Sequence, residues 1–196
     1  MRTAEIKRKT SETEIELRLN LDGTGAGKIQ TGVGFIDHML TLFARHSRVD
    51  MDVICRGDTM VDDHHSAEDI GIVLGMALSK ALSDKRGIRR YGSMLLPMDE
   101  ALVLCAVDLS GRSCLRLTAD IPSQKIGTFD TELVEEFFLA FTRSCGATLH
   151  IRQLDGTNSH HIVEAMFKAF GRAMREAVSY DDAARDEIPS TKGVLV

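Results

Sequence analysis

Tryptophan is absent from the 196-residue sequence, and aromatic residues make up only 5% of it. The sequence therefore lacks the aromatic platforms on which nucleic-acid bases stack. Its net charge of −5 gives no electrostatic reason to expect a nucleic acid as partner. No apolar run approaches the ~20 residues that cross a bilayer, and the charged N-terminus does not resemble a signal peptide. We therefore predict a cytoplasmic protein that binds neither nucleic acid nor membrane.

Cysteine and proline are also scarce, with four and three residues respectively. The cysteines form no C-x-x-C pair, which favours free and mostly buried thiols in a cytosolic protein. We expect the prolines Pro97, Pro122 and Pro189 to lie between secondary-structure elements. The sequence contains no P-loop and no G-x-G-x-x-G motif, so nucleotide binding is disfavoured.

The chain contains an internal repeat. When the sequence is shifted by 96 residues, 64–83 align with 160–179 and seven of the twenty positions are identical. Chance identity of ~6% per position would give roughly one match. We therefore predict two halves, 1–90 and 91–180, and a C-terminal ligand-binding tail, 181–196, within one compact unit.

Hydrophobic periodicity predicts an α+β fold made of two β-β-α-β-α halves, with helices on one face of the sheet. We expect strands at 14–20, 49–55, 101–109, 113–120 and 147–152. We expect helices at 36–46, 66–83, 131–143 and 160–178. The tail lacks periodicity, and its segment IPSTKG is polar and available for a ligand.

Histidines and glutamates recur at the start of the two repeated helices. His64 and Glu68 are four residues apart and share one helix face, while His65 is turned by ~100° and points elsewhere. The second copy repeats this spacing at His160, His161 and Glu164. We predict two metal sites, each taking a pair from one helix and one histidine from the other. Imidazole and carboxylate ligands without cysteine suit Zn, Fe or Mn rather than a closed structural zinc site.

Basic residues suggest an anionic substrate. Lys168 follows Glu164 by four residues and continues the same helix face. Arg90, Arg112 and Lys192 each lie near glycine or serine, where backbone N–H groups and a cation together bind phosphate oxygens.

Several motifs carry a family resemblance. They are GVGFIDHML, DDHHSAEDIGIVLG, RRYG, MDEAL, DLSGR, TLHIRQLDGTNSHHIVEAMFKAFGRA, PSTKG and, at Arg8, Thr10, Glu12 and Thr13, the pattern R-x-T-x-E-T. In this order the sequence resembles the imidazoleglycerol-phosphate dehydratases, lyases of histidine biosynthesis, from about Arg8 to Val194. The length resembles that of the monofunctional form.

The resemblance implies a duplicated fold like a tandem of ribosomal protein S5 domain 2-like units, assembled from trimers into a homo-oligomer of 24 subunits. It also implies two Mn²⁺ per active site at subunit interfaces, although other divalent metals are possible. One implied ligand set is His64, Glu68, His150 and His161. The other is His38, His65, His160 and Glu164.

The implied reaction dehydrates D-erythro-imidazole glycerol phosphate to imidazole acetol phosphate through a di-metal-bound imidazolate and a diazafulvene. The residues assigned to catalysis are Glu12, His65, Glu68, His160 and Glu164. Glu12 is the candidate base, with a metal-bound water as its competitor. The residues assigned to substrate binding are Glu12, His38, His46, Arg90, Arg112, Lys168, Ser190, Thr191 and Lys192.

Two other functions remain open at this stage. A dinuclear metallohydrolase acting on a phosphorylated small molecule would need a carboxylate bridging the metals, whereas this sequence offers one glutamate per repeated helix. A metal-storing or metal-sensing cage would not explain why Arg90, Arg112 and Lys192 accompany the histidines.

Overall fold

The computed structural model describes residues 1–195, so Val196 of the predicted tail 181–196 lies outside the described residues. The first half contains β1 (Thr3–Lys9), β2 (Thr13–Asn20), β3 (Ile29–Gln30), α1 (Gly34–Ser47), β4 (Asp50–Gly57) and α2 (His64–Leu82). The second contains β5 (Tyr91–Met98), β6 (Ala101–Asp108), β7 (Cys114–Thr118), β8 (Lys125–Ile126), β9 (Phe129–Asp130), α3 (Leu133–Cys145), β10 (Thr148–Asp155) and α4 (Ser159–Val178).

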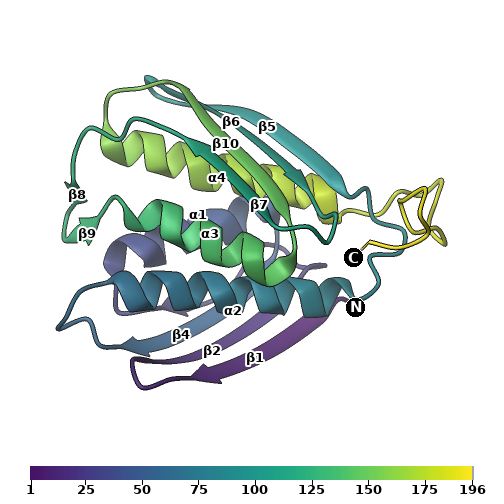
Figure 1. Cartoon of the computed structure of the whole chain (residues 1–196), viewed down its shortest axis with the longest axis horizontal. Coiled ribbons are helices and arrows are strands. Elements are labelled where there is room, and N and C mark those ends of the chain that lie inside the picture. Colours follow the sequence, from purple (N-terminus) through teal and green to yellow (C-terminus); the bar gives the residue numbers. More distant parts are fainter. Residues whose placement is uncertain (196) are drawn as a thin grey trace.

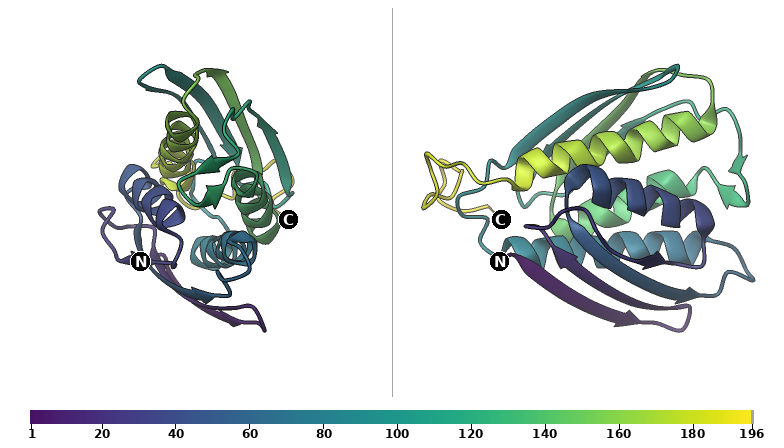
Figure 2. Two further views of the ribbon diagram at one scale, coloured as in Figure 1. Left: turned by 90° about the vertical axis from the view of Figure 1, so that its left-hand side faces the viewer. Right: turned by 180° about the vertical axis from the view of Figure 1, so that it is seen from behind.

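The molecule has four layers, with the helices of both halves between two outer sheets (Figures 1 and 2). The strand orders are β1-β2-β4-β3 in the first sheet and β5-β6-β10-β7 in the second. In each sheet the last strand of this order pairs parallel with its neighbour, and the other pairs are antiparallel. This equivalence confirms the predicted α+β class and the internal duplication.

Two edge strands, β1 and β5, are absent from the elements that the sequence predicts. Only Ala4 of β1 is fully buried, because the strand exposes mostly polar side chains at the sheet edge, and its apolar pattern is therefore weak. Pro97 lies inside β5 rather than between elements, which corrects the expectation from the sequence. An edge strand tolerates proline because only one of its sides needs backbone donors, and Pro97 pairs with Leu102 alone.

The two halves meet through their helices, α2 against α3 and α1 against α4 (Figure 2). A Cβ on Gly75 of α2 would lie 2.6 Å from the Phe141 carbonyl oxygen of α3. A Cβ on Gly171 of α4 would lie 3.0 Å from the Phe43 carbonyl oxygen of α1. Gly75 and Gly171 are equivalent in the repeat, so the duplicated glycines let both helix pairs approach closely.

The cysteines are free, as predicted, and Cys55, Cys105 and Cys145 are buried. Burial raises the pKa of the Cys55 thiol to about 11, so this group stays protonated at neutral pH. Among residues 1–195, no helix is both long and apolar enough to cross a membrane.

Candidate active site

Helices α1 and α4 bring three predicted ligands together. His160 Nε2 lies 3.0 Å from Glu164 Oε2, and His38 Nε2 lies 3.4 Å from the same oxygen. One ligand atom from each of the three residues lies within 4.8 Å of the other two, the separation expected when a single cation is shared. The donor set, two imidazoles and a carboxylate, fits a divalent transition metal.

The start of α4 is fixed by a cap. The Asn158 side-chain oxygen accepts hydrogen bonds from the backbone N–H groups of His160 and His161, at 2.9 and 3.2 Å. This arrangement places His160 in the first turn of the helix and Glu164 one turn later, on the same face.

Glu164 is the most buried member of the cluster, with 8% of its surface exposed. Burial alone would raise its carboxyl pKa, but Lys168 Nζ at 2.5 Å and the two histidines more than offset this effect, and the pKa is lowered. Glu164 therefore carries a negative charge at neutral pH, and Lys168 is held beside the cluster.

The start of α2 carries the equivalent residues in a looser arrangement. His64 Nε2 lies 3.9 Å from Glu68 Oε2, and both side chains are 42% exposed. His65 points away from this pair, as its position on the helix predicts. Its Nδ1 lies 3.0 Å from an oxygen of Asp58, and its Nε2 lies 3.7 Å from Glu12 Oε1.

The R-x-T-x-E-T segment fastens the β1–β2 hairpin onto α2. Arg8 Nη1 and Thr13 Oγ1 each lie 2.5 Å from Asp69 Oδ2 of that helix. Thr10 Oγ1 accepts from the backbone N–H groups of Glu12 and Thr13, at 3.1 and 3.0 Å. Together these contacts hold Glu12 at the hairpin turn, beside the ring of His65.

His46 lies further along α1, near the middle of α4. Burial lowers the pKa of its imidazole, and the positive charges of Lys168 and Arg172 lower it further. His46 and Lys168 therefore lie near each other, further along α1 and α4 than His38, His160 and Glu164.

The predicted phosphate-binding residues lie at the other end of the molecule. Arg90 Nε donates to Asp108 Oδ1 at 2.7 Å, and its Nη1 donates to the Pro189 carbonyl oxygen at 2.8 Å. This bond anchors the tail segment that carries Ser190, Thr191 and Lys192. The tail leaves the C-terminal end of α4, whose 20 residues span about 30 Å from the histidine cluster (Figure 1).

Arg112 and His150 also lie away from the helix starts. Arg112 is exposed in the segment between β6 and β7, four residues after Asp108, which Arg90 contacts. His150 is exposed on the face of the second sheet that turns away from the helices, beside Ala106 and Arg116. Of the two implied ligand sets, the described residues of one chain therefore assemble only His38, His160 and Glu164.

Sequence reasoning missed the acidic residues that contact the second histidine of each pair, namely Asp58, Asp99 and Glu100. A signal was present in the repeat: Glu12 directly precedes β2, and Glu100 directly precedes the equivalent strand β6. Glu100 Oε2 lies 2.7 Å from His161 Nδ1, and Asp99 Oδ2 lies 3.6 Å from His161 Nε2.

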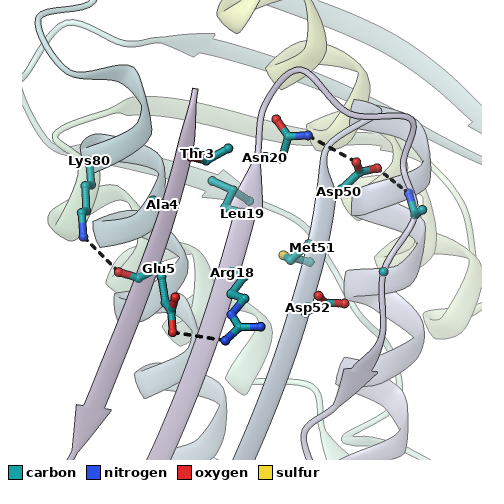
Figure 3. A pocket seen from close by; sticks show the side chains of 12 residues that line it. Thr3, Ala4, Glu5, Arg18, Leu19, Asn20, Asp50, Met51, Asp52 and Lys80 are labelled. Atoms are coloured by element: carbon teal, nitrogen blue, oxygen red, sulfur yellow. Dashed lines mark hydrogen bonds and ion pairs between the residues drawn. The ribbon is translucent and has the colours of Figure 1, made fainter. Parts of the chain in front are cut away.

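An open hollow of about 580 Å³ lies elsewhere, where β1, β2 and β4 run side by side (Figure 3). Glu5, Arg18 and Asp52 line it, and none of the predicted site residues does. Asp50, on its rim, accepts three backbone hydrogen bonds from the 24–26 loop. These bonds hold the 24–26 loop against β4, apart from the histidines.

Comparison with known proteins gives consistent matches. A sequence model of the family described as imidazoleglycerol-phosphate dehydratase matches residues 31–174. The imidazoleglycerol-phosphate dehydratase of Ruegeria pomeroyi is 62% identical over the full length of both chains, and that of Synechococcus sp. is 58% identical over 100% of this chain and 96% of its own.

Solved structures agree with these matches. The crystal structure of imidazoleglycerol-phosphate dehydratase from Staphylococcus aureus superposes with a TM-score of 0.84 at 43% identity, covering 91% of this chain and 99% of that one. The enzyme from Pyrococcus furiosus, in complex with (S)-C348, also gives a TM-score of 0.84, at 39% identity, covering 97% of this chain and 100% of that one.

Proposed function

Because this chain belongs to the imidazoleglycerol-phosphate dehydratase family, we propose from its geometry which residues perform the dehydration. The protein is a lyase of histidine biosynthesis that acts on a phosphorylated small molecule. The family relationship does not favour the metallohydrolase alternative. The observation that carries the proposal is the convergence of His38, His160 and Glu164 beside Lys168.

We propose that these three residues hold one Mn²⁺ and that His64 and Glu68 contribute to a second. Bound Mn²⁺ supplies Lewis acidity toward the imidazole ring of the substrate, which eases departure of the hydroxide. The arrangement of donors supports this assignment, because one ligand atom from each of His38, His160 and Glu164 lies within 4.8 Å of the other two.

Glu12 is our candidate for the group that takes the proton from the carbon adjacent to the one that loses hydroxide. Its side chain is 48% exposed, and its carboxylate oxygen Oε1 lies 3.7 Å from His65 Nε2. The turn fixes the position of this carboxylate, and its oxygens are not engaged in strong hydrogen bonds within the chain. The carboxylate is therefore available to a substrate.

Arg90, Arg112, Ser190, Thr191 and Lys192 are proposed to bind the phosphate. Because they lie about a helix length from the His38 cluster, one chain does not complete the site alone. We therefore propose that active sites form between subunits, with His150 supplied to a neighbouring copy, in a 24-subunit assembly built from trimers. The free cysteines support the cytoplasmic location that we also propose.

The test uses two variants, each altered in one of the two groups of residues that a complete active site is proposed to need. Glu164→Gln removes a metal ligand, and the double variant Arg112→Gln/Lys192→Ala weakens the phosphate site, so each alone should convert imidazole glycerol phosphate poorly. The two variants are unfolded together and reassembled with Mn²⁺. Some active sites would then combine intact metal ligands from one subunit with an intact phosphate site from another, and activity should rise above that of either variant. Differently tagged copies, pulled down together, verify mixing. Mixed assemblies with no regained activity would refute shared sites.

A further inference from the structure

The second histidine of each pair is held by a carboxylate through the same ring nitrogen. His65 Nδ1 lies 3.0 and 3.2 Å from the two oxygens of Asp58. His161 Nδ1 lies 2.7 Å from Glu100 Oε2. In both rings this leaves Nε2 as the other nitrogen, directed toward a second and more distant carboxylate, at 3.7 and 3.6 Å.

The Glu100 carboxylate is itself held in place. Its Oε1 accepts from the backbone N–H groups of Asn158 and Thr157, at 2.8 and 3.2 Å. Asp58 is fixed through its backbone, whose N–H donates to the Glu12 carbonyl oxygen at 3.1 Å.

The two contacts are independent of each other in the sequence. Asp58 belongs to the segment between β4 and α2, whereas Glu100 belongs to the β5–β6 turn. At the repeat offset of 96 residues, the position of Asp58 corresponds to Leu154. The two halves thus make the same contact with carboxylates from different elements, which an accidental surface pair would not explain.

Stability alone does not account for these pairs. The His65 and Asp58 side chains are 33% and 31% exposed, and those of His161 and Glu100 are 28% and 39% exposed. Pairs this accessible to water contribute little to folding. The geometric effect is larger, because a carboxylate at Nδ1 favours the tautomer that carries its proton there.

We propose that Asp58 and Glu100 are positioning residues that fix His65 and His161 as Nδ1–H tautomers, with the Nε2 lone pair free for a divalent cation. This inference rests on the metal-binding role proposed above for the two histidines. Carboxylates that hold the far nitrogen of a ligating imidazole orient the ring and strengthen it as a ligand.

Glu100→Gln tests the inference sharply. The amide oxygen would keep the bonds from Asn158 and Thr157, which turns the NH₂ group toward His161 Nδ1. That donor requires the opposite tautomer, with the proton on the nitrogen that should bind metal. Asp58→Asn tests the other half, with a smaller effect expected because either oxygen of Asp58 can reach the ring.

Asp62→Asn is the matched control for charge. Asp62 Oδ1 accepts from the His64 backbone N–H at 2.8 Å, and asparagine can keep this bond. Like Asp58→Asn, the variant removes one carboxylate charge beside the start of α2, but the bond of Asp62 is to a backbone N–H rather than to an imidazole. His161→Gln serves as the variant that lacks a proposed ligand.

Mn²⁺ affinity is measured by the EPR signal of free Mn²⁺ in titrations of metal-free protein. We expect Glu100→Gln to weaken binding about 10–100-fold and Asp58→Asn less, with Asp62→Asn near the parent protein. Thermal unfolding of the metal-free variants should stay close to the parent. Imidazole ¹⁵N spectra in alkaline buffer should show one histidine moving from the Nδ1–H to the Nε2–H tautomer in Glu100→Gln.

Three outcomes would count against the inference. Equal affinity of Glu100→Gln, Asp58→Asn and Asp62→Asn, with His161→Gln clearly weaker, would overturn the positioning role and leave the proposed metal site intact. Unchanged ¹⁵N spectra in Glu100→Gln would also overturn it. A parent protein that binds Mn²⁺ no better than His161→Gln would overturn the proposed role of His161 as a ligand together with this inference.

Discussion

Glu12 and Glu100 occupy equivalent places in the two halves, yet their surroundings differ. Glu100 accepts bonds from one imidazole and two backbone N–H groups. The Glu12 carboxylate lies no closer than 3.7 Å to His65, and Thr10 holds only its backbone. After duplication, one carboxylate is thus committed to holding a histidine, while the other is free to meet a substrate.

Replacing Glu12 with glutamine should therefore separate chemistry from assembly. We expect Glu12→Gln to lower kcat by about 10²–10⁴-fold, the usual contribution of a general base, with KM little changed. Steady-state kinetics and metal analysis provide the measurement. Glu14→Gln is the control, since Glu14 is exposed on the same hairpin and bonds only to Lys9 at 3.1 Å. Normal turnover by Glu12→Gln would assign the proton transfer to another group.

At the scale of elements, close contacts between backbones hold the two halves together. Gly75→Ala would place a Cβ 2.6 Å from the Phe141 carbonyl oxygen and 2.7 Å from Ser144 Cβ. We expect the free energy of unfolding to fall by about 1–3 kcal/mol, the usual cost of overpacking, measured by urea unfolding. Gly34→Ala at the start of α1 meets no atom within 4 Å and should be neutral. A neutral Gly75→Ala would contradict the close packing of α2 on α3.

The carboxylate of Asp50 holds most of the loop before β3. Asp50 Oδ1 accepts from the backbone N–H groups of Thr24, Gly25 and Ala26, at 2.8, 3.0 and 2.9 Å. These bonds from the backbone lower the pKa of Asp50. We expect Asp50→Ala to cost about 1–2 kcal/mol at pH 7, because three exposed N–H groups return to water.

The pH dependence of this loss has a definite sign. Because the folded-state pKa is depressed, the contribution of Asp50 is present above its unfolded-state value of about 3.8 and disappears as pH falls through the lowered pKa. The difference between parent and Asp50→Ala should shrink in urea titrations at acidic pH. Asp52→Ala, whose side chain accepts only from Lys28 N–H, is the control. A difference that grows on acidification would refute the assignment.

At the scale of the whole molecule, the histidine clusters and the tail lie at opposite ends (Figures 1 and 2). His150 is exposed on the outer face of the second sheet, away from the other proposed ligands. A metal ion that binds His150 from one copy and helix-start ligands from another would link subunits. Its binding free energy would then contribute to the interface.

Removal of metal should therefore reduce the size of the assembly. We expect exhaustive chelation to convert the proposed 24-subunit assembly into a smaller oligomer, a trimer, as measured by light scattering. Added Mn²⁺ should restore the original mass, whereas Mg²⁺, which prefers oxygen ligands, should restore it poorly. An oligomer of unchanged mass after chelation would show that metal does not hold the subunits together.

The sequence by itself determined the α+β class, the duplication and the presence of the two repeated helices, although the predicted helix 66–83 begins two residues earlier in the structure, at His64. These follow from local periodicity and from a spacing of four residues that places His160 and Glu164 on one face. The edge strands β1 and β5 escaped prediction because their exposed positions leave a weak apolar pattern.

Only the tertiary structure decided which chemistry-bearing residues meet. It joined His38 of α1 to the α4 pair and set Asp58 and Glu100 against the second histidines, contacts between segments far apart in the chain. It also placed Arg90 and the tail at the far end of α4. Such distances depend on how helices and hairpins pack, and periodicity within one segment carries no information about its partner.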